Sequence, residues 1–214
     1  MRMPWKITED MQIWRLILSL YLSQGFSQVF INALLQMFSG FMLEAQMGSL
    51  RMACFWFIGG ILANMFGAAT TDYYATGAEP AIFCMLVGLV GMYVYYWDRM
   101  GEQTCQKICG LIMLIVIIVV AIFILTTFAE GVSTYSKLAR IVYPDSTGFF
   151  GGALFGMPLA WIFLVPTEGS LGKASRRERG LFIGGLVWAI LVATLVIVFF
   201  STGEYEEYWT YDDD

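Results

Sequence analysis

The side chain best suited to chemistry in this 214-residue chain is Glu79, a carboxylate at the start of a long apolar run. Pro80 follows it, and the pair could simply begin a helix. Proline is favoured in the first helical turn, and an acidic group there meets the positive end of the helix dipole. Alternatively, Glu79 could bind a ligand or another helix, because ionisable groups kept inside a membrane usually face a cavity and function there. Both roles fit the sequence.

Four cysteines are the other candidates for chemistry. Cys105 and Cys109 are four residues apart and would share one face of a helix. They form at most half a zinc site, because the chain has no histidine and no second cysteine pair. Cys54 and Cys84 fall inside apolar runs, where a thiol behaves as a small apolar group. We therefore predict no metal and no cofactor.

Composition indicates a multi-pass integral membrane protein. Hydrophobic residues make up 58% of the chain, charged residues only 14%, and the mean hydropathy is +0.69. Soluble domains carry roughly 25% charged residues. The charges also cluster between long uncharged runs, as a hydrocarbon core about 30 Å thick requires of spanning helices. The net charge of −5 argues against nucleic acid as a partner.

The hydropathy pattern predicts an all-α fold with about six transmembrane helices. The apolar stretch from Ile13 to Phe26 is interrupted by Arg15 and Gly25, which favours an interfacial or re-entrant hairpin over a seventh span. No signal peptide is visible before it. The predicted organisation is an N-terminal segment with an interfacial loop at 1–27, a transmembrane domain at 28–201 and an acidic, aromatic tail at 202–214. The predicted spans are 28–43, 52–71, 80–97, 107–128, 147–165 and 180–201.

The distribution of basic residues predicts the orientation. The loops after the first, third and fifth predicted spans hold seven lysines and arginines, and the opposite side holds five together with the acidic tail. We therefore expect the loop with Arg176, Arg177 and Arg179 to face the cytosol or matrix, and both termini to lie on the other side.

Short motifs within residues 12–97 resemble the rhomboid family of intramembrane serine proteases in both order and spacing. Trp14-Arg15 is similar to the pair that begins the family's membrane-embedded first loop, and Gln28 to Asn32 follow the register of its His-x-x-x-Asn motif. Further matches are Leu43-Glu44, Gly48-Ser49-Leu50-Arg51 and Gly59 to Asn64. The resemblance implies a rhomboid-like bundle with an embedded first loop. No predicted span precedes Trp14, so we expect the family's first helix to be absent or supplied by another chain.

The resemblance also locates two catalytic positions, and neither holds a catalytic residue. Rhomboid proteases place their nucleophile in Gly-x-Ser-Gly, where this chain has Gly77-Ala78-Glu79-Pro80. Their base comes from His-x-Gly-Gly-x-x-x-Gly, and Phe149 stands at the histidine position. Gln28 replaces the histidine that helps line the oxyanion site, although Asn32 is kept. A serine needs an adjacent base for attack, so we expect no protease activity.

Small residues predict close helix packing, as expected for helices that associate in lipid. Gly148, Gly152 and Gly156 recur every four residues, and Gly88 and Gly91 lie on a comparable face of an earlier span. By resemblance to inactive rhomboids, we expect a non-enzymatic protein that binds transmembrane helices of other proteins, in contact with membrane lipid. The expected binding residues are Glu79, Asn32, Gln28, Trp14 and Arg15.

Two alternatives accompany this expectation. The chain could be a structural subunit of a larger membrane complex, such as a mitochondrial inner-membrane assembly. It could also be a transporter component with Glu79 as a proton or cation site. The expected compartment is accordingly the endoplasmic reticulum and Golgi or the mitochondrial inner membrane.

Overall fold

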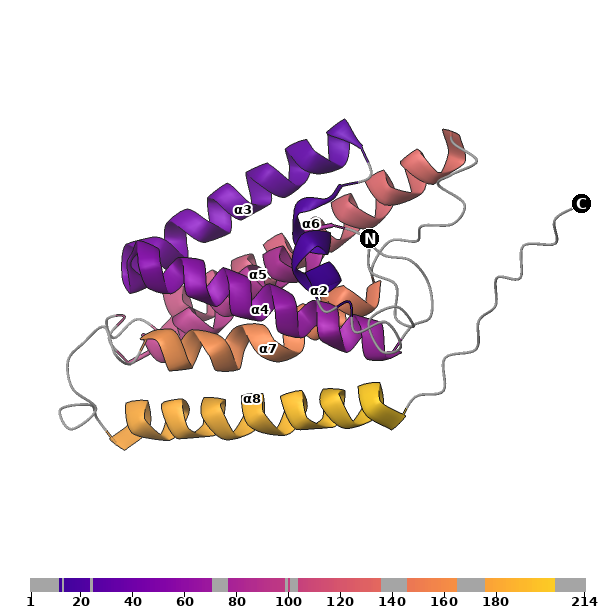
Figure 1. The fold of residues 1–214 in the computed structure, drawn as a ribbon. Coiled ribbons are helices and arrows are strands. Elements are labelled where there is room, and N and C mark those ends of the chain that lie inside the picture. Colours follow the sequence, from indigo (N-terminus) through magenta and orange to yellow (C-terminus); the bar gives the residue numbers. More distant parts are fainter. Residues whose placement is uncertain are drawn as a thin grey trace, which may run out of the picture.

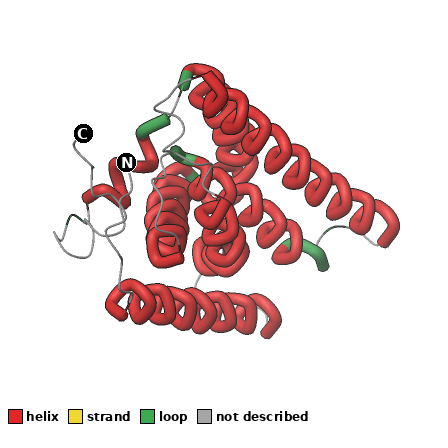
Figure 2. The backbone as a smooth tube through the Cα atoms, turned by 90° about the vertical axis from the view of Figure 1, so that its right-hand side faces the viewer, coloured by secondary structure: helices red, strands yellow, loops and turns green. Residues whose placement is uncertain are grey.

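Every regular element in the described part of the chain is a helix (Figures 1 and 2). The computed structural model describes residues 12, 14–23, 25–70, 77–98, 100, 104–135, 146–164 and 176–202. Its elements are α2 (Trp14–Leu18), η1 (Ser19–Tyr21), α3 (Phe26–Met47), α4 (Ser49–Thr70), α5 (Glu79–Tyr95), α6 (Thr104–Tyr135), α7 (Ser146–Leu164) and α8 (Arg176–Thr202). The all-α prediction is confirmed.

Each of the six predicted spans coincides with one long helix, from α3 to α8. Among the described segments, α3, α4, α6, α7 and α8 are long and apolar enough to cross a membrane, whereas α5 is apolar but has only 17 residues. At 1.5 Å per residue, α5 is about 25 Å long. The stretch around Arg15 forms the short α2 and η1, which are too short to span. Of the predicted tail at 202–214, all but the first residue lies outside the described residues.

The α5 helix is the centre of the bundle. Twelve of its 17 residues are buried, and it packs against α3, α4, α6 and α7. Ile82, Met85 and Leu86 have no exposed surface. An apolar helix in a membrane can face either lipid or protein, and the buried residues of α5 show that neighbouring helices surround it. The shortest of the six long helices is thus the one in the interior of the bundle.

Gly152 and Gly156 of α7 lie where α7 meets α5. A Cβ atom on Gly152 would lie 2.5 Å from the carbonyl oxygen of Pro80, and one on Gly156 would overlap the carbonyl oxygen of Cys84. The backbones therefore approach more closely than any larger residue permits, as small-residue helix contacts in membranes do. Gly148 is buried, Gly88 faces Phe55, and Gly91 faces the backbone of Met157.

The outer helices α6 and α8 contact the rest of the bundle less than α5 and α7 do. Tyr93 of α5 donates a hydrogen bond to the carbonyl oxygen of Lys107 in α6, at 3.0 Å. Figure 1 shows α8 lying beside α7, where Trp188 donates to the carbonyl oxygen of Leu154 at 3.0 Å. Large apolar side chains on both outer helices are exposed, as lipid contact requires.

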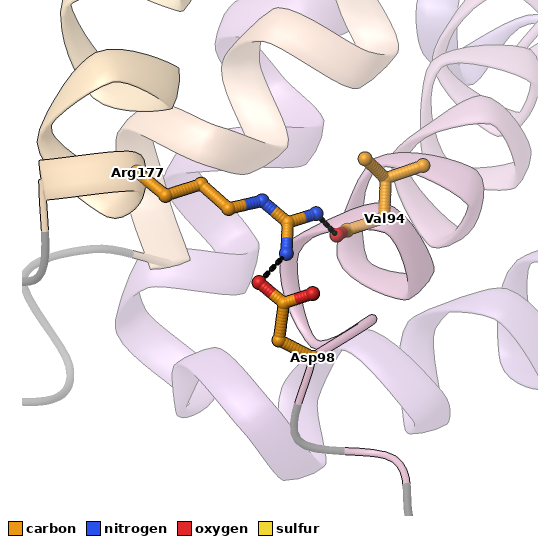
Figure 3. Close-up of polar contacts among 3 residues, drawn as sticks. All are labelled: Val94, Asp98 and Arg177. Carbon is orange, nitrogen blue, oxygen red and sulfur yellow. Dashed lines mark hydrogen bonds and ion pairs between the residues drawn. The ribbon is translucent and has the colours of Figure 1, made fainter. Parts of the chain in front are cut away.

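A second link joins the start of α8 to the end of α5. The Arg177 guanidinium pairs with Asp98 and donates a 3.0 Å hydrogen bond to the carbonyl oxygen of Val94 (Figure 3). A cation at the C-terminal end of a helix satisfies its open carbonyls and meets the negative end of its dipole. Arg177, predicted only as a topology signal, therefore also caps α5.

Candidate functional site

The carboxylate of Glu79 lies at the centre of a buried polar cluster. Asn32 donates to Glu79 Oε1 from Nδ2 at 3.1 Å, and Gln28 donates to the same oxygen from Nε2. Gln28 and Asn32 are four residues apart in α3, so they share the face that α3 presents to the start of α5. All three side chains are at least 92% buried. The structure thus brings together three of the five residues predicted to bind a partner.

The chain before α5 is shaped around this carboxylate. Gly77 has φ of +136°, a conformation that residues with a side chain rarely adopt, and a Cβ atom there would overlap the Glu79 carboxylate. Helix α5 begins at Glu79, and Pro80 lies in its first turn. This geometry agrees with the helix-start interpretation of the pair. The carboxylate also meets the positive end of the α5 dipole.

A second buried polar cluster holds the first loop in place. Asn64 of α4 donates to the carbonyl oxygen of Leu16 at 3.0 Å and to Ser19 Oγ at 2.9 Å. Ser19 Oγ donates in turn to the Leu16 carbonyl, also at 3.0 Å. In the sequence, Asn64 was recognisable only as part of a motif, and the role of Ser19 was not predicted. A polar residue inside an apolar run was the available signal, because a buried amide or hydroxyl requires a partner.

The two polar clusters are joined through the backbone. The Gly77 N–H donates to the carbonyl oxygen of Ser19 at 3.1 Å. The first loop, the positive-φ glycine and the start of α5 therefore form one connected hydrogen-bonded unit.

Phe149 occupies the place next to the first turn of α5. It lies on α7, is buried, and stacks on Phe83 with ring centroids 5.0 Å apart and an interplanar angle of 26°. Phe83 is four residues beyond Glu79 and thus one turn along α5. A phenyl ring neither accepts nor donates a proton, so this contact contributes packing and no acid or base.

The Glu79 cluster offers hydrogen-bonding groups but no acid–base pair. Of its three side chains only the carboxylate titrates, since Gln28 and Asn32 are neutral amides. One further acceptor is present: Asn32 Oδ1 is buried and accepts no hydrogen bond from the described residues. Buried amide oxygens are normally satisfied. The cluster could therefore receive a donor from outside.

Trp14 and Arg15 are not part of this cluster. The Arg15 guanidinium lies 4.9 Å from the centroid of the Trp14 ring, and its Nε donates to Gln12. Trp14 is 52% exposed, whereas Glu79 is 3% exposed. The five residues predicted to bind a partner thus separate into a buried group and a surface group.

The described residues contain no cluster of three or more His, Cys, Asp or Glu side chains that could hold a metal ion. Cys105 and Cys109 are exposed in the first turns of α6, and Cys84 is buried against α7.

Residues 10–166 match the family model described as the Rhomboid domain. Over 87 residues the chain is 33% identical to Inactive RHOMBOID-like protein 8 of Arabidopsis thaliana, covering 40% of this chain and 25% of that protein. RHOMBOID-like protein 5 of the same plant is 25% identical over 163 residues, with coverage of 75% and 47%. Rhomboid-like protease 5 of Toxoplasma gondii is 25% identical over 152 residues, with coverage of 71% and 17%. The chain spans less than half the length of each of these three relatives.

Proposed function

This chain belongs to the rhomboid family, and we propose that it is a non-enzymatic member that binds transmembrane helices of other membrane proteins. The names of its relatives include both a protease and an inactive protein. Activity therefore has to be argued from the residues of this chain.

The observation that carries the proposal is the Glu79 cluster itself. The resemblance puts the catalytic serine at this position, and here a buried carboxylate accepts hydrogen bonds from Gln28 and Asn32. Satisfying a buried charge needs such donors, because an unpaired one is costly in a low-dielectric interior. The former catalytic position has thus become a polar contact between α3 and α5.

Phe149 supports the loss of catalysis. The resemblance puts the histidine base at this position, and the phenyl ring stacked on Phe83 offers no proton acceptor. Peptide hydrolysis through a serine needs both a nucleophile and a base. The 214 residues include no histidine, so no other position of this sequence can supply the imidazole base.

Helix binding at this site requires α3 to move, because α3 covers Glu79. The fully buried positions in the first half of α3 are the polar Gln28 and Asn32, with Ile31 and Leu35 partly buried against the core, and large apolar residues are fully buried only near its end, at Leu43 and Met47. Burying polar or small side chains contributes less than burying large apolar ones. The start of α3 is therefore the part that a partner helix can displace most easily, with the end as the fixed point.

Displacing the start of α3 would free the Glu79 carboxylate on α5 and carry Asn32 Oδ1 with α3, so a partner helix between the two can pair with both acceptors. Both are acceptors, so the matching partner helix carries a donor such as lysine, arginine or asparagine near the bilayer centre. Trp14 and Arg15, at the surface, would contact the same helix nearer its end. In this role the protein acts in the endoplasmic reticulum or Golgi, in trafficking or quality control of clients.

The decisive experiment compares partner recovery by Glu79→Gln and wild type after extraction in mild detergent. If the carboxylate pairs with a polar or basic group, its loss should cost about 1.5–3 kcal/mol of binding. That corresponds to roughly a tenfold to hundredfold weaker affinity. Asp98→Asn, a carboxylate change at the exposed end of α5, is the matched control and should leave recovery unchanged. Undiminished recovery in Glu79→Gln would rule out this binding mode.

A separate test addresses catalysis. Wild type should neither cleave rhomboid substrates nor react with serine-directed probes. The double change Glu79→Ser with Phe149→His should still give little activity, because Pro80 and Gln28 remain where the family has glycine and histidine. Robust cleavage by wild type would refute the proposal.

A structural subunit of a larger complex is the second candidate, because the exposed apolar face of α6 can pack against a neighbouring subunit as well as against lipid. Most of the described apolar residues of α6 are exposed, among them Met113, Val119 and Phe123. A native gel separates the two functions, since a permanent subunit gives one stable large band and a client binder gives weak, heterogeneous association. The mitochondrial inner membrane is the compartment that goes with this alternative.

A further inference from the structure

Helices α4, α7 and α8 line a cavity that is open on one side and shares no residue with the Glu79 cluster. Its volume is about 390 Å³. At Gly185, α8 is so close to α7 that a Cβ atom would lie 2.7 Å from the carbonyl oxygen of Pro158. Further along α8 this close contact gives way to the cavity, whose walls include Phe66, Ala69, Leu154, Trp188, Leu191 and Leu195.

The cavity presents no polar group that a ligand could use. Thr70 is its one hydroxyl, and Thr70 Oγ1 donates to the carbonyl oxygen of Phe66 at 3.0 Å within α4. The Trp188 indole N–H donates to the carbonyl oxygen of Leu154 at 3.0 Å. Water enters a cavity only where polar partners hold it, so this space favours an apolar occupant.

The cavity is smaller than one turn of helix and suits a hydrocarbon chain. One turn of α-helix, about 5.4 Å long and about 10 Å across, already occupies roughly 420 Å³. A methylene group is close in size to a water molecule, which takes up about 30 Å³ in the liquid. The cavity therefore has room for roughly 13 methylene groups. That is close to the length of one acyl chain of a membrane phospholipid.

We propose that one phospholipid acyl chain occupies this cavity and fills the gap between α8 and the α4–α7 pair. The acyl chain enters from the lipid side, where Trp188, Leu191 and Leu195 are partly exposed. The bound lipid thereby adds to the packing of α8, which also includes the contacts at Gly185, Trp188 and Arg177 and the buried Val192 and Val196.

The test uses the full-length chain, freed of lipid in detergent and titrated with phosphatidylcholine that carries bromine atoms in mid-chain. Bromine quenches tryptophan fluorescence on contact, and the Trp188 signal is obtained by subtracting that of Trp188→Phe. We expect quenching that saturates at a single lipid per chain. Ala69→Phe, which fills the cavity from α4, should lose the saturable quenching.

Gly184→Leu is the matched control, since it adds an apolar side chain to α8 at a position where a Cβ atom meets nothing. It should keep the saturable quenching. Leu195→Phe repeats the filling from the α8 wall in case Ala69→Phe fails to fold. Quenching that only rises in proportion to lipid, or that persists in both filled variants, overturns the proposal. The proposal is also overturned if a copurifying protein has to be removed before the lipid quenches Trp188 fluorescence, because that protein then occupies the cavity.

Discussion

Each end of α5 has a charged side chain that faces the helix dipole, but the two side chains lie in different surroundings. At the start of the helix, the acidic Glu79 faces the positive end of the dipole and is buried under Gln28 and Asn32. At the end, Arg177 faces the negative end and pairs with Asp98, with exposed fractions of 40% and 67% for the two side chains. Electrostatic contacts are strong where water is excluded and weak where it is not. The contacts at the start of α5 should therefore contribute more to stability than the exposed pair at its end.

The largest loss of stability is expected for Gly152→Leu, which disrupts the backbone contact beside the start of α5. The added side chain has to displace the Pro80 carbonyl, and overpacking against rigid backbone costs up to about 3 kcal/mol and occasionally more. Thermal unfolding in detergent should show a clearly lowered midpoint. Gly180→Leu, on α8 with open space around it, is the control and should unfold like wild type. An unchanged midpoint for Gly152→Leu would mean that α5 and α7 are further apart than described.

A moderate effect is expected for Glu79→Leu. The change leaves the amides of Gln28 and Asn32 buried without their acceptor, which costs about 1–3 kcal/mol. Glu79→Gln keeps an acceptor oxygen and should lose less. Equal loss in the two variants would show that charge at the dipole, and not hydrogen bonding, is what Glu79 contributes to stability.

The smallest effect is expected for Arg177→Ala at the other end. An exposed ion pair and a charge on a helix end each contribute about 0.3–1 kcal/mol, and salt screens both. Arg176→Ala, the neighbouring arginine, serves as control in the same unfolding assay. Should Arg177→Ala destabilise more than Glu79→Leu, the ranking of the two ends would be reversed.

The long helices were predictable because each depends on a local run of apolar residues. Gln28, Asn32 and Glu79 could also be grouped before the structure was known, but only through the family register, since α3 and α5 are separated in sequence by all of α4. The pairing of Ser19 with Asn64, the cap from Arg177 to Val94 and the cavity beside Trp188 were not predicted. Each depends on how two or three helices are rotated against one another, and hydropathy carries no information on rotation.

Gly77 has a consequence for how this sequence can change over generations. Its φ of +136° and the carboxylate that occupies the space of a Cβ atom make positions 77 and 79 interdependent. A side chain at 77 becomes tolerable only after the residue at 79 has been shortened, and even then the backbone conformation remains strained. Descendants of this chain must therefore accept changes at 79 before 77, so the order of substitution is constrained by sterics alone.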